Sequence, residues 1–366
     1  MKILICANND VGLYNFRKDL IKKLIEMNNE LHISLPYGRK VEGLKQIGCT
    51  FIDTKIDRRG INPLKDMILL VSYFFIMRKL KPDMVITYTI KPNIYAGIVC
   101  RLLNIKYVLN ITGLGYVFQK ESWLKKVLER AYFFICQKAH VVFFENISNK
   151  DVFLNLGIVN CSKTFVLKGA GVNTKEYKLA LYPLDSVVTR FLFVGRIMQD
   201  KGIEELILAV KKLKMKYGDS VELDLVGLYE ENYAKKIEQL VCEKIVNYHG
   251  FQDDVKPFIN RAHCLVLPSY HEGMSNVLLE AAAMGRPLIT TDIAGCREAV
   301  LDGQSGLLCK VRDAQDLYMK MQEFVELSYQ SKRNMGLISH SYVTDNFNKD
   351  DVVEATIKMI LKSRMI

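Results

Sequence analysis

Two series of apolar, strand-like runs separated by helical patterns constrain the fold of this chain more than any other feature. The first series occupies residues 3–167, and a second restarts at residue 191 and reaches residue 290. The runs are continuously apolar, which is typical of strands buried on both faces of a parallel sheet. A chain of 366 residues is long enough for two such domains. The sequence therefore predicts an α/β fold of two doubly wound, Rossmann-like domains, whose ligand loops face a cleft.

A loop-like stretch separates the two series. Residues 169–186 contain glycines, Pro183 and Ser186, which are typical of a linker. We therefore expect a first domain over residues 1–168 and a second over 169–347. A last helix, within residues 348–366, follows a break and is expected to join the first domain.

The composition excludes several classes of protein. About half of the residues are apolar and a quarter are charged, which is typical of a globular protein and not of a disordered one. The nine cysteines include no C-x-x-C pair and no accompanying histidine cluster. We therefore expect reduced cysteines, with neither a disulfide framework nor a metal site. The first apolar run is too short for a signal peptide, so we expect a cytoplasmic protein.

Positive charge is concentrated in the first half of the chain. Residues 1–168 contain 26 Lys and Arg against 13 Asp and Glu, whereas the remainder contains 25 against 27. A basic domain attracts anions, which here include phospholipid head groups, diphosphates and nucleic acid.

Two apolar segments of this basic half leave alternatives open. The run 67–77 is too short to span a bilayer, which takes about 20 residues. A buried helix is the favoured interpretation, and a helix that dips into a membrane surface is the other. Residues 123–134 combine basic and aromatic side chains. This pattern is typical of an amphipathic helix that packs on the protein, and equally of a helix that lies on a membrane interface.

The first motif that indicates chemistry is the segment 194–202, with the pattern G-R-x4-K-G. It follows a predicted strand and precedes a predicted helix. Gly195 permits a tight turn, Arg196 offers a planar set of donors, and Lys201 offers a point charge. The free N–H groups of the next helix add to an anion site. The cluster suits a diphosphate, although an ordinary exposed loop has the same composition.

The second motif is the segment 269–281, with the pattern E-x7-E. Ser275 or Asn276 is expected to cap the next helix, which leaves the amides of residues 273–277 free for an anion. Glu272 and Glu280 carry carboxylates that can each accept hydrogen bonds from sugar hydroxyls. The alternative is that Glu272 is solvated and that Glu280 only interacts with its own helix.

The pairing of these motifs, in this order on consecutive strand–helix junctions, resembles glycosyltransferase family 4, of the GT-B fold. Segments 291–300 and 302–308 strengthen the resemblance, which covers essentially the whole chain. It implies a retaining transfer of a sugar from a nucleotide-diphosphate sugar without a metal ion or other cofactor. Arg196 and Lys201 would take the place of a metal, and the only D-x-D-like sequence, Glu222-Leu223-Asp224, lies on a predicted strand.

The resemblance also implies roles for particular residues. The catalytic residues would be Arg196, Lys201 and Glu272. Glu280 would bind the ribose, and the segment from His249 would border the nucleobase. The full set of implied donor-binding residues is Gly12, Gly195, Arg196, Lys201, His249, Gly250, Phe251, Glu272, Gly273, Met274, Ser275, Asn276, Val277 and Glu280.

Within the family, segments 12–17, 89–93, 113–115 and 145–146 resemble a subgroup that builds bacterial surface glycans such as capsule and O-antigen. This subgroup implies a UDP-sugar donor and an acceptor on undecaprenyl diphosphate, at the cytoplasmic face of the inner membrane. The candidate acceptor-binding residues are Arg17, Lys91, Gly113 and Gly115. The family's usual catalytic histidine has no counterpart, so none is assigned.

Two alternatives to a transferase remain at this point. A UDP-sugar 2-epimerase shares two Rossmann-like domains, and it would convert a UDP-sugar into an isomer without an acceptor. A non-enzymatic nucleic-acid binder would account for the positive charge, but the sequence contains none of the modules that read or stack bases. We therefore expect no nucleic-acid partner.

Overall fold

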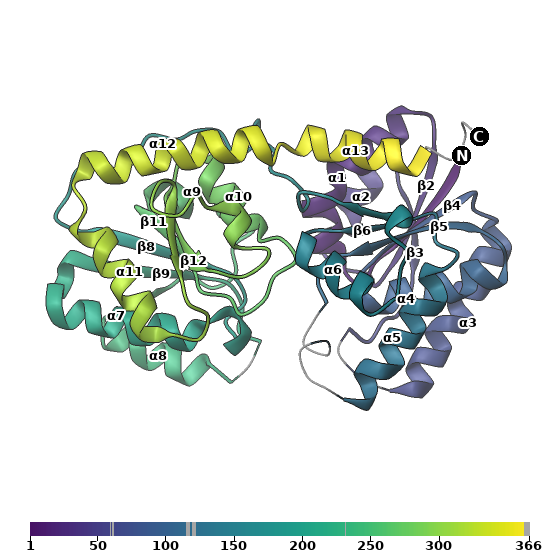
Figure 1. Ribbon diagram of the computed structural model, residues 1–366, viewed down its shortest axis with the longest axis horizontal. Helices are drawn as coiled ribbons and strands as arrows, with labels where there is room; N and C mark the ends of the chain where they lie inside the picture. Colours follow the sequence, from purple (N-terminus) through teal and green to yellow (C-terminus); the bar gives the residue numbers. More distant parts are fainter. Residues whose placement is uncertain (59, 61, 115–117, 119–121, 231, 362–366) are drawn as a thin grey trace. The chain divides into compact units, whose positions relative to one another are not determined.

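The computed structural model describes residues 1–58, 60, 62–114, 118, 122–230 and 232–361. The chain divides into two compact units (Figure 1). The first comprises Met1–Ala170 and the C-terminal segment from Lys349, and the second is Gly171–Asn348. Each unit is built on one parallel sheet with helices on both faces, which confirms the predicted pair of doubly wound sheets.

The first unit contains a sheet with the strand order β3-β2-β1-β4-β5-β6-β7 in the described residues, and every pairing in it is parallel. Its strands are β1 (Lys2–Cys6), β2 (Glu30–Leu35), β3 (Thr50–Asp53), β4 (Met84–Tyr88), β5 (Lys106–Ile111), β6 (Val141–Phe144) and β7 (Thr164–Val166). Its helices are α1 (Asp10–Glu26), α2 (Val41–Ile47), α3 (Pro63–Leu80), α4 (Ile90–Leu102), α5 (Trp123–Cys136), α6 (Ile147–Asn155) and α13 (Lys349–Leu361).

Alternation along the strands divides the core of this unit into two layers. Ile3 and Ile5 of β1 pack in one cluster with α1 and α13, whereas Leu4 and Cys6 pack in another with α3, α4 and α5. The C-terminal helix α13 is held on α1 by the ion pair between Lys349 and Asp19, at 3.5 Å. Figure 1 shows α3, α4 and α5 on the same side of the sheet.

The second unit contains a sheet with the order β10-β9-β8-β11-β12-β13 in the described residues, again parallel throughout. Its strands are β8 (Thr189–Val194), β9 (Val221–Val226), β10 (Asn247–Tyr248), β11 (Cys264–Leu267), β12 (Leu288–Thr291) and β13 (Gly306–Cys309). Its helices are α7 (Ile203–Tyr217), α8 (Ala234–Cys242), α9 (Lys256–Arg261), α10 (Asn276–Ala283), α11 (Ala314–Glu326) and α12 (Tyr329–Asn346).

Four elements differ from the sequence-based expectation. The apolar pattern of the sequence predicts a first helix over residues 16–26. Helix α1 begins earlier, at Asp10, because the Asn9 side chain accepts a hydrogen bond from the N–H of Gly12 at 2.6 Å and so caps the helix. The sequence pattern did not predict β13, which is short and begins with a glycine, or the helices α11 and α12. These three elements lie beyond the two motif-bearing loops, in the last third of the chain.

Helix α3 contains the apolar run 67–77 and is buried on one face only. Leu69, Tyr73 and Met77 pack in the core, whereas Ile68 and Phe75 are exposed. The interpretation of a buried helix is therefore confirmed for one face and wrong for the other. Among the described residues, no helix combines the length and the apolar composition needed to cross a bilayer.

Candidate functional site

The loop after β8 carries Arg196 and Lys201 in the second unit. It passes through the 3-10 helix η3 (Gln199–Lys201) into α7. Arg196 forms an ion pair with Glu230 at 2.7 Å and keeps much of its side chain exposed. Lys201 is largely buried, and its Nζ contacts the carboxylate of Glu272. The fold thus joins the cation of the first motif to the first carboxylate of the second.

The loop after β11 holds Glu272 in place. The hydroxyl of Ser269 donates to Oε1 of Glu272 at 2.8 Å, the same oxygen that Lys201 contacts. The N–H of Tyr270 donates to the carbonyl oxygen of Asp200 at 2.9 Å. The Tyr270–Asp200 bond and the Lys201–Glu272 contact join two loops that are about 70 residues apart in sequence, and the Ser269 bond orients the carboxylate within one of them, so the pair belongs to a built junction and is not a chance surface contact.

Gly202 allows the two loops to approach each other. Its φ angle is +68°, in the left-handed region that favours glycine. A Cβ atom at this position would lie 2.0 Å from the carbonyl oxygen of Pro268, the residue that follows β11. The absence of a side chain at 202 therefore lets the loop of Lys201 lie directly on the loop of Glu272.

We predict that Gly202→Ala lowers activity at this site at least tenfold, because the added methyl group separates the loops that hold Lys201 and Glu272. Gly303→Ala is the matched control. Gly303 has a similar φ of +74°, but a Cβ there would meet nothing within 4 Å. It should cost only the roughly 1 kcal/mol of a left-handed non-glycine residue and leave that activity unchanged. Equal activity in both variants, measured beside their melting temperatures, would contradict the role given to Gly202.

His271 lies in the loop after β11, with its Nε2 3.8 Å from the carboxylate of Asp200. Burial lowers the pKa of its imidazole; Asp200 and Glu272 oppose that effect, and Lys201 and Arg196 add to it. The ring is thus within electrostatic reach of both motifs and is neutral near pH 7. Its Nδ1 is buried without a hydrogen-bond partner in the described part of the chain. The sequence analysis gave His271 no role, although its position next to Glu272 was the available signal.

The amides at the start of α10 are only partly available. Ser275 is the N-cap residue, as predicted, but its side chain forms no capping hydrogen bond. Its N–H donates to the carbonyl oxygen of Gly295 at 2.8 Å, so the expectation of a free amide at this position is wrong. The reason is tertiary, since the loop after β12 packs on this turn. Asn276 is in the first turn, and its Oδ1 is buried without a hydrogen-bond partner among the described residues.

The remaining residues of the second motif line the same helix and loop. Met274 is buried, and Gly273 contributes a carbonyl oxygen that lies against Gly295. Val277 is in the first turn of α10 and Glu280 is in the second. Burial raises the pKa of the Tyr177 hydroxyl, and the neighbouring Glu280 carboxylate, to which it is hydrogen-bonded, raises it further. Glu280 therefore faces Tyr177, whereas Lys201 faces Glu272.

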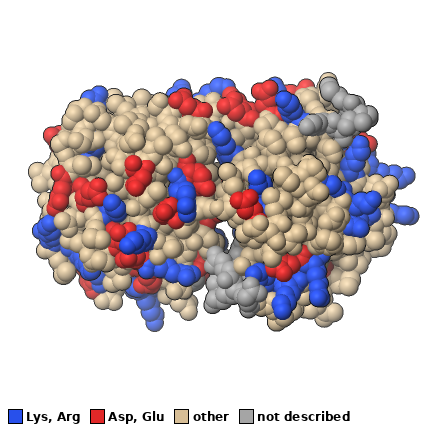
Figure 2. Space-filling view, in the orientation of Figure 1, with Lys and Arg blue, Asp and Glu red and all other residues tan. Residues whose placement is uncertain are grey.

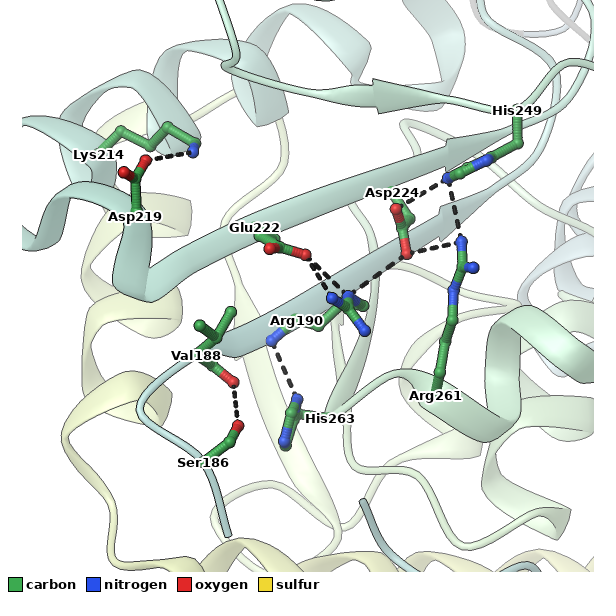
Figure 3. A network of polar contacts seen from close by, with 10 residues as sticks. All are labelled: Ser186, Val188, Arg190, Lys214, Asp219, Glu222, Asp224, His249, Arg261 and His263. Carbon is green, nitrogen blue, oxygen red and sulfur yellow. Dashed lines mark hydrogen bonds and ion pairs between the residues drawn. The ribbon is translucent and has the colours of Figure 1, made fainter. Parts of the chain in front are cut away.

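The predicted nucleobase segment is held by a network of charges, shown in Figure 3. Nε2 of His249 lies 2.8 Å from Oδ1 of Asp224, and Oδ2 of Asp224 lies 3.1 Å from the guanidinium of Arg261. The carbonyl oxygen of Gly250 accepts from the N–H of Gly227 at 2.8 Å. These contacts fix the turn after β10, while the next residue, Phe251, is exposed.

The D-x-D-like sequence lies on a strand, as predicted, and its carboxylates are paired. Glu222 and Asp224 are both in β9, and Arg190 of β8 contacts both, at 2.6 Å and 3.8 Å (Figure 3). The N–H of Gly195 also has a partner within the protein, because it donates a hydrogen bond to the carbonyl oxygen of Val226 at 2.9 Å. That the reaction requires no metal stays a prediction.

The candidate residues of the first unit make internal contacts. The N–H of Gly12 donates to Oδ1 of Asn9, the N-cap residue of α1. Arg17, a candidate acceptor-binding residue, is buried and ion-paired with Glu145 at 2.7 Å. Lys91 pairs with Asp66 at 2.6 Å and also donates to the carbonyl oxygen of residue 60. Gly113 has φ +138°, which favours glycine, and Gly115 lies outside the described residues.

Comparison with known proteins gives consistent matches in both units. Residues 2–146 match the family model "Glycosyl transferase 4-like", and residues 188–326 match "Glycosyl transferases group 1". The chain is 27% identical over 345 residues to a Campylobacter jejuni enzyme, N,N'-diacetylbacillosaminyl-diphospho-undecaprenol alpha-1,3-N-acetylgalactosaminyltransferase, covering 89% of this chain and 90% of that protein. It is 26% identical to the capsular polysaccharide biosynthesis glycosyltransferase CapM of Staphylococcus aureus, covering 88% and 86% of the two chains.

A solved structure shares the fold. The Anabaena protein HepE, in complex with UDP and glucose, superposes with a TM-score of 0.82 at 18% identity, over 98% of this chain and 99% of that one.

Proposed function

The chain belongs to the family 4 glycosyltransferases, of the GT-B fold, and we propose that it transfers a hexose or N-acetylhexosamine from a UDP-sugar to a polyprenyl-diphosphate-linked saccharide. Membership of this family argues against the two alternatives raised by the sequence, a UDP-sugar 2-epimerase and a non-enzymatic nucleic-acid binder. The donor, the acceptor, the stereochemistry and the residue roles are the proposal.

The contact between Lys201 and Glu272 is the observation that carries the donor assignment. In a nucleotide sugar, the diphosphate and the sugar ring are joined by one bond, so the groups that recognise them must lie side by side. Lys201 supplies the cation for a phosphate, and Glu272 supplies acceptors for sugar hydroxyls, within one hydrogen-bonded junction. Arg196, on the same loop, adds a second cation. Glu280 would bind the ribose, and residues 249–251 would border the base.

The proposed chemistry needs no enzyme nucleophile. In a retaining transfer of this type, the departing diphosphate removes the proton from the attacking hydroxyl on the same face of the sugar. The protein then contributes by positioning the two substrates and by stabilising the charge that develops on the leaving group. Arg196 and Lys201 are preorganised cations suited to that task. The buried Oδ1 of Asn276 offers a further hydrogen-bond acceptor at the start of α10.

The first unit would bind the acceptor. The Campylobacter jejuni relative is named for a diphospho-undecaprenol-linked substrate, and the basic excess of residues 1–168 favours a diphosphate. We propose Gly113 and Gly115 for close approach of the backbone to this acceptor. Arg17 and Lys91 would contribute positive potential, and direct contact would require them to exchange Glu145 and Asp66 for phosphate oxygens. The enzyme would act at the cytoplasmic face of the inner membrane.

The decisive experiment is incubation with a panel of UDP- and GDP-sugars in the presence of EDTA. We expect slow hydrolysis of one or a few UDP-sugars, unaffected by the chelator, and a product whose anomeric configuration by NMR is that of the donor. Selective use of GDP-sugars, loss of activity with EDTA, or an inverted product would each contradict the corresponding part of the proposal. A new UDP-sugar isomer formed without acceptor would contradict transfer.

A further inference from the structure

The outward face of α3 is apolar. Leu64, Met67, Ile68, Val71 and Phe75 recur at helical spacing and are 44–77% exposed. The opposite face of the same helix is buried in the core, so the stripe is not needed for folding the unit. Surface helices of globular proteins ordinarily carry polar residues on their outward side, and a contiguous apolar stripe indicates an interaction surface.

Helix α5, on the same side of the sheet, also exposes apolar side chains. Trp123, Val127, Phe133 and Phe134 are 40–70% exposed. Helix α4 contacts both α3 and α5, and the guanidinium of Arg101 in α4 lies 3.9 Å from the ring centroid of Phe134. The three helices therefore form one layer (Figure 1). Its two flanking members, α3 and α5, expose apolar side chains.

Cations border and interrupt the apolar side chains. Lys126 and Arg130 are exposed on the face of α5 that carries Trp123, and Arg78 and Lys79 are exposed at the end of α3. Figure 2 shows blue side chains beside the tan surface at the lower end and the right-hand edge of this unit. Aromatic and aliphatic residues interleaved with Lys and Arg are typical of surfaces that bind anionic membranes.

We propose that the outward faces of α3 and α5 dock on an anionic lipid surface. The interleaved cations favour this occupant over a second copy of the chain, because a symmetric dimer through the same patch would bring two positively charged surfaces together. The inference rests on the proposed function in one respect, namely that the acceptor is lipid-linked. It adds the surface by which the enzyme reaches that lipid.

The orientation of the helices fits this role. In a doubly wound sheet, each helix starts near the carboxyl edge of the strands, where ligand loops lie. The first turns of α3 and α4 are joined there by the Lys91–Asp66 ion pair at 2.6 Å. Leu64 and Trp123, near the starts of α3 and α5, are among the most exposed apolar residues of the patch. Docking would therefore bring the acceptor edge of the sheet to the level of the lipid head groups.

Vesicle co-sedimentation tests the proposal. We expect the full chain to bind vesicles of phosphatidylglycerol and phosphatidylcholine, and to bind pure phosphatidylcholine much more weakly. Ile68→Ser with Phe75→Ser should weaken binding to the anionic vesicles at least tenfold, and Lys126→Gln with Arg130→Gln should weaken it about fivefold per charge. The control Leu208→Ser with Met215→Ser removes equally exposed apolar side chains from α7 of the other unit and should change nothing.

Three results would overturn the docking surface. These are failure of the wild-type chain to bind anionic vesicles, equal binding by the Ile68→Ser/Phe75→Ser variant, and complete release by high salt, which would leave charge as the only tether. A dimer that this variant dissociates, without vesicle binding, would assign the patch to a second copy. UDP-sugar hydrolysis, measured in parallel without lipid, should be unchanged in both patch variants. If the wild-type chain binds anionic vesicles but hydrolyses no UDP-sugar, the result would contradict the proposed donor and leave the docking surface supported.

Discussion

Replacing Lys201 with alanine is expected to lower glycosyl transfer by about 100- to 1,000-fold while the chain stays folded. In the proposed mechanism, the Lys201 ammonium group neutralises charge on the departing diphosphate, so its contribution to the rate is made in the transition state. Transfer should therefore fall through kcat, with a smaller change in KM for the donor. Steady-state kinetics with the UDP-sugar that the wild type uses would measure both constants.

The structure supplies a matched control for this variant. Lys236 also pairs with a glutamate, Glu204, in the same unit, but the pair is exposed on the surface. Lys236→Ala should leave kcat and the melting temperature nearly unchanged, because exposed ion pairs contribute little. Lys201→Arg keeps the positive charge with a different shape and should retain part of the activity. If Lys201→Ala kept activity within about fivefold of wild type, Lys201 would not be the leaving-group cation.

Replacing Glu145 with alanine is expected to destabilise the first unit by about 3–5 kcal/mol. Glu145 follows β6 and pairs with Arg17 of α1 at 2.7 Å, and the two side chains are only 10% and 9% exposed. The Arg17 guanidinium also lies 5.0 Å from the ring centroid of Tyr88. Without Glu145, a buried cation loses its carboxylate, and a buried charge without a counter-charge is far more costly than the intact pair is stabilising. Denaturant unfolding would measure the loss, and the melting temperature should fall by on the order of 10 °C.

Two further variants separate the buried charge from general disruption. Glu42→Ala breaks the exposed Lys45–Glu42 pair of α2, and its effect should be below about 1 kcal/mol. Arg17→Met with Glu145→Leu replaces both charges by apolar side chains and should recover most of the lost stability. Comparable destabilisation by Glu145→Ala and Glu42→Ala would show that the pair is not an integral part of the core.

The sequence predicted the architecture well because parallel doubly wound sheets leave a local signature. Their strands are buried on both faces and read as continuous apolar runs, for example residues 191–194 and 264–267. Helix starts were harder to predict. A single side-chain cap at Asn9 moved the start of α1 to Asp10, and Ser275 occupies a cap position without forming the bond. Such details depend on one rotamer and on what packs against it.

Within the candidate site, the sequence identified the residues and the structure identified their partners. The motif pattern located Arg196, Lys201 and Glu272, but no spacing rule predicts that Arg196 pairs with Glu230. The same limit applied to Arg17, whose partner Glu145 is 128 residues away. Contacts of this kind follow from strand order and loop packing, and neither is encoded in a short window of sequence.

The sequence by itself determined the fold class and the two motif-bearing loops, because both depend on residues that are neighbours along the chain. Only the tertiary structure decided which charges are paired and which apolar residues remain exposed. Arg17 and Lys91 were candidate acceptor-binding residues and are ion-paired within the protein, whereas the run 67–77 was interpreted as a buried helix and exposes four of its ten apolar side chains. The physical reason is that a side chain's exposure is set by the elements packed beside it, and one face of α3 packs on the sheet while the other meets none of the described elements.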